Sequence, residues 1–124
     1  MDTSSRRERG EQMFREVVLR EPPQGDDVFM DFTVEEIFGS VWTRPGLTRK
    51  ERRLITLATV AMTGSSLAIN SHVNTGLQSG DITPEEMMEL VIHFAHYGGW
   101  PRAVVLHREV LAAIAALKSS AETK

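Results

Sequence analysis

The chain contains no cysteine, which excludes disulfide bonds, thiolate catalysis and cysteine-ligated metal sites. It also lacks any run of roughly 18 consecutive apolar residues, the length that a membrane-spanning helix needs. Residues 1–9 are polar and charged, without the apolar segment of a secretory signal. From these absences we expect a soluble, cytoplasmic protein that neither spans nor binds a membrane.

An excess of positive charge is missing as well. The formal net charge is -3 and the isoelectric point is about 5.8. Binding to the phosphates of a nucleic acid requires a dense basic face, so no nucleic-acid partner is expected. Basic residues do cluster at Arg6 and Arg7 and again between Arg49 and Arg53, where a solvated helix face is the simpler interpretation.

What the chain does contain favours an all-α fold of about six helices. Its 124 residues, 41% of them hydrophobic, are enough for one domain with its own core. We expect a single domain over residues 1–124, with 1–5 and 118–124 flexible. No segment alternates with period two and no Asn-Gly or Asp-Gly turn occurs, so no sheet is expected. A helical chain this short leaves apolar surface for a partner subunit.

Apolar residues at helical spacing, together with start and stop signals, give the expected helices. They lie at residues 6–19, 31–41, 48–64, 67–80, 83–97 and 101–117. The candidate N-caps are Asp31 or Thr33, then Thr48, and then Thr83. Glu51 and Glu86 lie three residues after the last two of these, as in a capping box. Gly64 and Gly80 fit the ends of two helices, because glycine readily adopts the left-handed conformation found there.

Five short segments occur in an order typical of one family. They are Trp42-Thr43-Arg44-Pro45-Gly46-Leu47, Arg53-Leu54-Ile55-Thr56-Leu57-Ala58, His72, Ile82-Thr83-Pro84-Glu85-Glu86 and Tyr97-Gly98-Gly99-Trp100-Pro101. With them the sequence resembles the carboxymuconolactone decarboxylase family from about Arg9 to Ala113. The resemblance implies an alkyl hydroperoxidase D-like helical protomer that assembles into a homo-oligomer, a trimer or hexamer, with active sites at or near subunit interfaces.

The resemblance also implies a reaction. The named activity is a carboxy-lyase reaction that removes carbon dioxide from 4-carboxymuconolactone, giving 3-oxoadipate enol-lactone in the β-ketoadipate pathway of bacterial aromatic catabolism. A small conjugated carboxylic acid or lactone is therefore the expected substrate. No cofactor is expected, because the conjugated ring itself accepts the electron pair that decarboxylation leaves behind.

Several positions differ from the patterns of the relatives. The redox branch of the superfamily uses two cysteines before the histidine, and these positions are Ser65 and Ala68 here, which excludes a thiol-dependent peroxidase. The decarboxylases usually have a glutamate where Ala68 stands, an arginine where Asn74 stands and a small aliphatic residue where Trp100 stands. These changes leave open a relative redirected to another unsaturated acid, for example in a biosynthetic pathway, or a non-catalytic oligomeric binding module.

His72 is the candidate catalytic residue. Decarboxylation requires a group that stabilises the developing oxyanion and one that returns a proton to carbon. Histidine suits either role, since its pKa lies near ~6.5. A buried histidine bonded to a neighbouring carbonyl is the structural alternative, and the family position favours catalysis over it.

The candidate substrate-binding residues lie in two regions. Arg44 stands in the loop after the second helix, where its guanidinium could hold a carboxylate or instead bond carbonyl oxygens or an acid of a partner subunit. The others are Trp42, Asn74, His96, Tyr97 and Trp100, with packing the stronger expectation for Trp42. For Arg53 we expect an ion pair with Glu51, Glu85 or a partner chain.

Metal binding is considered because His93 and His96 lie three residues apart, with Glu89 four residues before His93. No second helix completes such a ligand set convincingly, so no metal is expected. Polar contacts in the core or at an interface are the simpler role for these histidines. His107 is expected to have no function.

Overall fold

The computed structural model describes residues 5–122, which form six α-helices and one π-helix, with no strand among them. The expected all-α fold class is therefore confirmed. The chain divides into two compact units, residues 1–49 and 50–124. That residues 1–124 form one domain stays a prediction. Of the helices in this described part, none is both long and apolar enough to cross a membrane.

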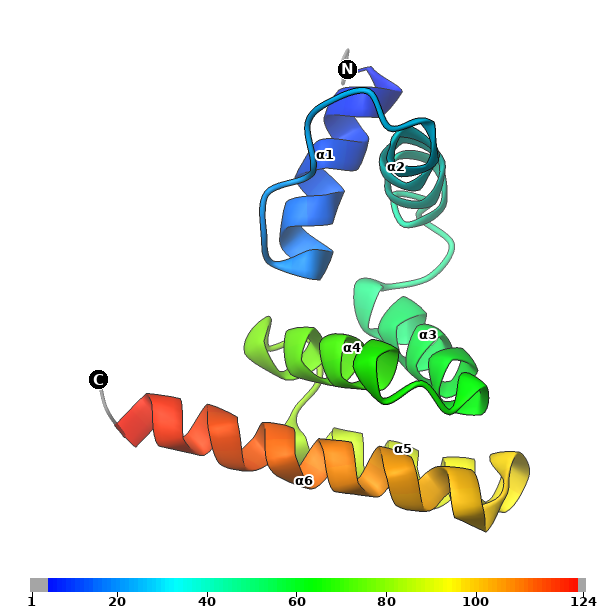
Figure 1. Cartoon of the computed structure of the whole chain (residues 1–124), viewed down its shortest axis with the longest axis vertical. Coiled ribbons are helices and arrows are strands. Elements are labelled where there is room, and N and C mark those ends of the chain that lie inside the picture. Colours follow the sequence, from blue (N-terminus) through cyan, green and yellow to red (C-terminus); the bar gives the residue numbers. More distant parts are fainter. Residues whose placement is uncertain (1–4, 123–124) are drawn as a thin grey trace. The chain divides into compact units, whose positions relative to one another are not determined.

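The first unit consists of helix α1 (Arg6–Val18) packed against a continuous helical segment made of α2 (Val28–Phe32) and the π-helix η1 (Thr33–Val41) (Figure 1). Its small core contains Phe14, Val17, Val34 and Phe38. The two helices approach closely at glycines. A Cβ on Gly39 would lie 2.5 Å from the carbonyl oxygen of Arg6, so only glycine allows this contact.

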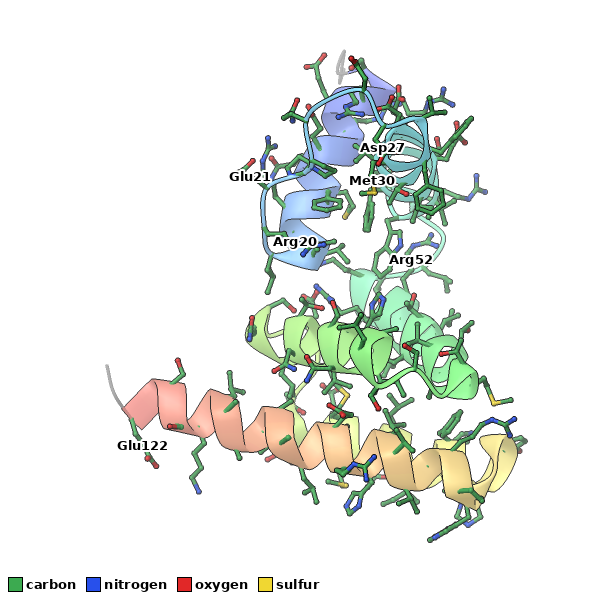
Figure 2. The ribbon with its side chains drawn as sticks, in the orientation of Figure 1. Arg20, Glu21, Asp27, Met30, Arg52 and Glu122 are labelled. Carbon is green, nitrogen blue, oxygen red and sulfur yellow. The ribbon has the colours of Figure 1, made fainter. Side chains whose placement is uncertain are left out.

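The helix starts in the first unit differ in part from the sequence prediction. Ser5, expected to be flexible, is the N-cap of α1 in a capping box with Glu8; residues 1–4 lie outside the described residues. The prediction of Asp31 or Thr33 as the next N-cap is wrong. The N-cap is Asp27, whose carboxylate accepts from the backbone N–H of Phe29 at 3.1 Å and of Met30 at 3.4 Å (Figure 2).

A π-helix follows α2 where an α-helix is expected. The backbone N–H of Trp42 donates to the carbonyl of Ile37, five residues earlier, at 2.9 Å, the hydrogen-bond step that defines this wider helix. Phe38 lies on its buried face, edge-on to Phe14 with ring centroids 5.1 Å apart. Apolar periodicity alone does not distinguish the two helix types over so short a segment.

Helices α3 (Arg49–Thr63), α4 (Ser66–Gln78), α5 (Pro84–Gly98) and α6 (Trp100–Glu122) form the second unit, apart from the first residue of α3. Helices α4 and α5 both pack along α6 (Figure 1). The largest side chains that are almost completely buried in this unit are Leu57, Ile69, Val73, Ile82, Met87, Leu106 and Val110. This core holds the helix that carries His72.

Most helix ends in the second unit are where the sequence predicts them. Gly64 and Gly80 have positive φ angles of 72° and 79° and follow α3 and α4. Thr83 forms the expected capping box with Glu86 at the start of α5. The exception is α6, which was expected to end before Lys118 and instead continues to Glu122 (Figure 2). Residues 123–124 lie outside the described residues.

Candidate functional site

His72 is half-buried on α4. The helix is anchored by Ile69 and Val73, which face the core with no exposed surface. Thr75 lies three residues after His72, on a neighbouring part of the helix surface. Its hydroxyl is within hydrogen-bond reach of the backbone carbonyl oxygens of Ser71, at 3.0 Å, and His72, at 3.4 Å. The hydroxyl of Thr75 thus contacts the backbone of the turn that carries His72.

A buried arginine lies next to this turn. Arg53 projects from α3 with 2% of its side chain exposed, and its Nε donates to Oδ2 of Asp81 at 2.7 Å. Its Nη1 donates to the hydroxyl of Thr75 at 3.4 Å. Asp81 lies in the turn between α4 and α5, where its backbone N–H donates to Oγ of Ser79 at 3.1 Å. We call Arg53, Thr75 and Asp81 the Arg53 cluster.

The sequence names Arg53 but not its partner Asp81. A signal for its burial was present, because Arg53, Leu57 and Ala61 recur every four residues along one side of α3. Leu57 and Ala61 belong to the core of this unit, so a charged side chain in the same register requires a partner of opposite charge. Which carboxylate supplies that charge depends on how the turn after α4 folds.

Burial of His72 lowers the pKa of its imidazole, and the positive charge of Arg53 lowers it further. The imidazole is therefore neutral at neutral pH. In that form one ring nitrogen carries a hydrogen and can donate, while the other can accept. The arrangement suits donation of a hydrogen bond to an oxygen that gains negative charge.

A second cluster of candidate residues surrounds a groove of about 700 Å³ on α5. His96 and Tyr97 line it, and the ring of Tyr97 stacks on that of His93 at 5.1 Å. Nδ1 of His96 donates to the carbonyl of Ile92 at 2.7 Å, which orients the ring. The other lining residues are Leu54, Glu86, Glu89, Leu90, Ile92 and His93.

Trp100 joins this cluster from the start of α6. Its ring stands edge-on to that of His96, with centroids 6.1 Å apart and an interplanar angle of 87°. It also lines a mostly apolar cavity of about 200 Å³ between α5 and α6, together with His107. The structure thus brings together His96, Tyr97 and Trp100. Within the described residues, His72 is not among those that line either hollow.

The remaining candidates lie elsewhere. The side-chain amide of Asn74 donates to the carbonyl of Asn70 on its own helix at 2.8 Å, and a two-residue step turns it away from His72. In the first unit, the ring of Trp42 stacks on that of Phe38 at 6.1 Å, as packing predicts. Arg44 is exposed in the following turn, where its backbone N–H donates to the carbonyl of Val41 at 3.2 Å. Substrate binding by these residues stays a prediction.

The histidines of α5 show ring and backbone contacts and no ligand set. His93 stacks on Tyr97 and His96 bonds its own helix. In the part of the chain that the structure describes, no three histidine, aspartate or glutamate side chains gather in a way that could hold a metal ion.

Comparison with known proteins gives a consistent result. The model of the carboxymuconolactone decarboxylase family matches residues 28–118. The chain is 34% identical over 73 residues to 4-carboxymuconolactone decarboxylase of Acinetobacter baylyi, an alignment that covers 59% of this chain and 54% of that protein. It is 35% identical over 74 residues to nitrosuccinic acid decarboxylase of Metarhizium robertsii, covering 60% of this chain and 51% of that protein.

The chain therefore spans about half the length of these curated relatives. The family match, in contrast, extends over most of the chain, from α2 into α6. The chain belongs to the carboxymuconolactone decarboxylase family.

Proposed function

We propose that the protein is a carboxy-lyase that removes carbon dioxide from a small carboxylic acid. One observation carries the proposal: two relatives that match about 60% of the chain are both named as decarboxylases, although their names give different acids. The reaction is common to the two names and the substrate is not. We therefore propose the type of reaction, decarboxylation, separately from the identity of the acid.

His72 is the proposed catalytic residue. When the bond to the carboxylate breaks, its electron pair must move onto an acceptor group conjugated with the same carbon, and an oxygen of that group becomes negative. A neutral imidazole N–H can stabilise this oxygen. The lowered pKa of His72 supports this role over that of a proton donor, because the imidazole is uncharged at neutral pH.

The first substrate to test is 4-carboxymuconolactone, and aromatic catabolism is the proposed pathway. Asn74 and Trp100 stand where the decarboxylases usually have an arginine and a small aliphatic residue, and they support the alternative of another unsaturated acid. His96 and Tyr97 in the groove, with Trp100 beside them, are the proposed contacts to the body of the substrate. Arg44 is the proposed anchor for its carboxylate.

We further propose that the protein is a homo-oligomer, a trimer or hexamer. The support is an apolar surface of the second unit, to which α5 contributes Ile92 and α6 contributes Trp100, Val104 and Leu111. Each of these side chains is about half exposed or more. Water-exposed apolar side chains gathered on neighbouring helices are typical of a subunit interface. A site near such an interface would take residues from two chains.

The test is incubation of the purified protein with freshly prepared 4-carboxymuconolactone, following loss of lactone and release of carbon dioxide. Release that disappears in His72→Ala supports the reaction and its central residue. No release from folded wild-type protein would contradict this substrate, and nitrosuccinic acid and other unsaturated acids would be screened next. If none of them turns over, the binding-module alternative replaces the proposal.

The pH dependence of kcat separates the two roles of His72. A hydrogen-bond donor keeps a ring N–H in both the neutral and the protonated form, so kcat should not fall as the pH is raised through the pKa of the imidazole. A general acid must be protonated, and kcat would then fall over the same range.

A further inference from the structure

We propose that Arg53 is a positioning residue for His72, held beside it by Asp81 and Thr75 so that a fixed positive charge lies near the imidazole. The inference rests on the proposed function, in which His72 acts on the substrate. It adds a residue to the site that contacts no substrate and acts through another side chain.

The burial of Arg53 decides how it can act. Only 2% of its side chain is exposed, so a substrate cannot reach the guanidinium without displacing the residues around it. Its partner Asp81 is also largely buried, with 15% of the side chain exposed. Loss of one member of a buried pair leaves the other charge uncompensated, which is strongly unfavourable. The ion pair with Asp81 therefore keeps the positive charge of the guanidinium in a fixed position.

Thr75 connects this charge to the turn that carries His72. Its hydroxyl oxygen accepts from Nη1 of Arg53 at 3.4 Å, and the same hydroxyl is within hydrogen-bond reach of the carbonyls of Ser71 and His72. Asp81 holds Nε of the guanidinium at 2.7 Å. Two different edges of Arg53 are thus fixed, one by α4 and one by the turn that follows it.

The electrostatic effect agrees with this geometry. The charged groups of the cluster are Arg53 from α3 and Asp81 from the turn between α4 and α5. After burial, the charge of Arg53 is what lowers the pKa of His72. Removal of that charge should raise the pKa, whereas a lysine at the same position should keep it low.

The first test follows the titration of the His72 ring by NMR in wild type, Arg53→Gln and Arg53→Lys, with the signal assigned by its absence in His72→Ala. Glutamine keeps hydrogen-bonding ability and removes the charge, and lysine keeps the charge. We expect a higher His72 pKa in Arg53→Gln and a value close to wild type in Arg53→Lys. An unchanged pKa in folded Arg53→Gln would overturn the proposal.

Asp81→Asn provides a second variant if Arg53→Gln does not fold. It leaves the arginine in place and removes the carboxylate that balances it, so the pKa of His72 should fall below that of wild type. A His72 titration that is the same in Asp81→Asn and wild type would overturn the proposal equally well.

The activity measurement keeps this inference separate from the proposed function. In an active enzyme, Arg53→Gln should move the change in kcat that accompanies titration of His72 to higher pH and leave KM almost unchanged, because Arg53 does not touch the substrate. If the wild type releases no carbon dioxide, the proposed function fails while the NMR result still tests the coupling. If the enzyme is active and this change in kcat stays at the same pH, only the role of Arg53 fails.

Discussion

The imidazole of His72 and the guanidinium of Arg53 are electrostatically coupled: burial first, and then the charge of Arg53, lowers the pKa of His72 below its ordinary value of 6.5. The unfolded chain, in which neither effect acts, binds a proton at higher pH than the folded protein does. The free energy of unfolding should therefore decrease as the pH falls through about 6.5. Below the pKa that His72 has in the folded protein, titration of this residue should change the free energy of unfolding no further.

Replacing His72 with Asn should remove this pH dependence. Urea unfolding at pH 7.5 and pH 5.5 would measure it, and the wild type should lose more stability between the two than His72→Asn does. Gln78→Ala, an exposed change on the same helix, should behave like wild type. Equal losses in wild type and His72→Asn would show that the imidazole is not perturbed.

The catalytic role of His72 predicts a large effect on rate. His72→Ala should reduce carbon dioxide release by about 100- to 1,000-fold, the usual effect of removing one oxyanion donor. Circular dichroism and gel filtration should show a folded protein of unchanged assembly, since His72 is only half-buried. Gln78→Ala should keep the wild-type rate, and a His72→Ala enzyme with near-normal turnover would end the assignment.

Two ion pairs of the second unit have equal length and different burial, which makes them a matched test. Arg53 and Asp81 are buried, whereas Lys50 and Glu86, also 2.7 Å apart, are about half exposed. Arg53→Met should lower the free energy of unfolding by roughly 3–5 kcal/mol, because Asp81 is left buried without its partner.

Lys50→Met, in contrast, should leave the free energy of unfolding nearly unchanged, since water already solvates the charges of both Lys50 and Glu86. Urea unfolding of the two variants and the wild type provides the comparison. Equal effects of the two substitutions would mean that burial does not decide the strength of these pairs.

The close contact between Gly39 and Arg6 predicts that Gly39 cannot be replaced without loss of stability. Gly39→Ala would place a Cβ 2.5 Å from a backbone carbonyl oxygen that cannot easily move. Overpacking of this kind typically costs about 1–3 kcal/mol. Gly46→Ala is the control, because its Cβ would meet no atom within 4 Å. A Gly39→Ala protein as stable as Gly46→Ala in urea would contradict the close approach.

The proposed subunit interface can be tested with a charge on α6. Val104→Glu places a carboxylate in the apolar surface of the second unit and should shift the protein toward smaller species in light scattering coupled to gel filtration, since an unpaired charge is poorly tolerated in an interface. Arg108→Glu, also exposed on α6, is the matched control. An unchanged mass for Val104→Glu would place any interface elsewhere.

The features that the sequence predicts correctly are those decided by near neighbours in the chain. Thr83 and Glu86 form their capping box within one turn of helix, and Gly64 and Gly80 adopt positive φ where two helices stop. Such contacts depend on a few adjacent residues, so pattern and residue type are enough to find them.

The errors involve distant residues. Asp31 is a reasonable N-cap from the sequence, but its carboxylate instead accepts from Arg7 at 3.0 Å, across 24 positions of the chain, and Asp27 is the cap. The pairing of Arg53 with Asp81 spans 28 positions. His72 was expected as a site residue, but its electrostatic surroundings were not, because they come from two other segments.

The π-helix η1 determines where the chain can change in length. Its hydrogen bonds span five residues, so each turn holds about one residue more than a turn of α-helix. Deleting one residue between Glu35 and Ile37 would let the segment close into α-helical turns while Val34 and Phe38 keep facing α1. The same deletion within α4 would rotate every later side chain of that helix by about 100°, taking His72 or its neighbours out of register with Arg53.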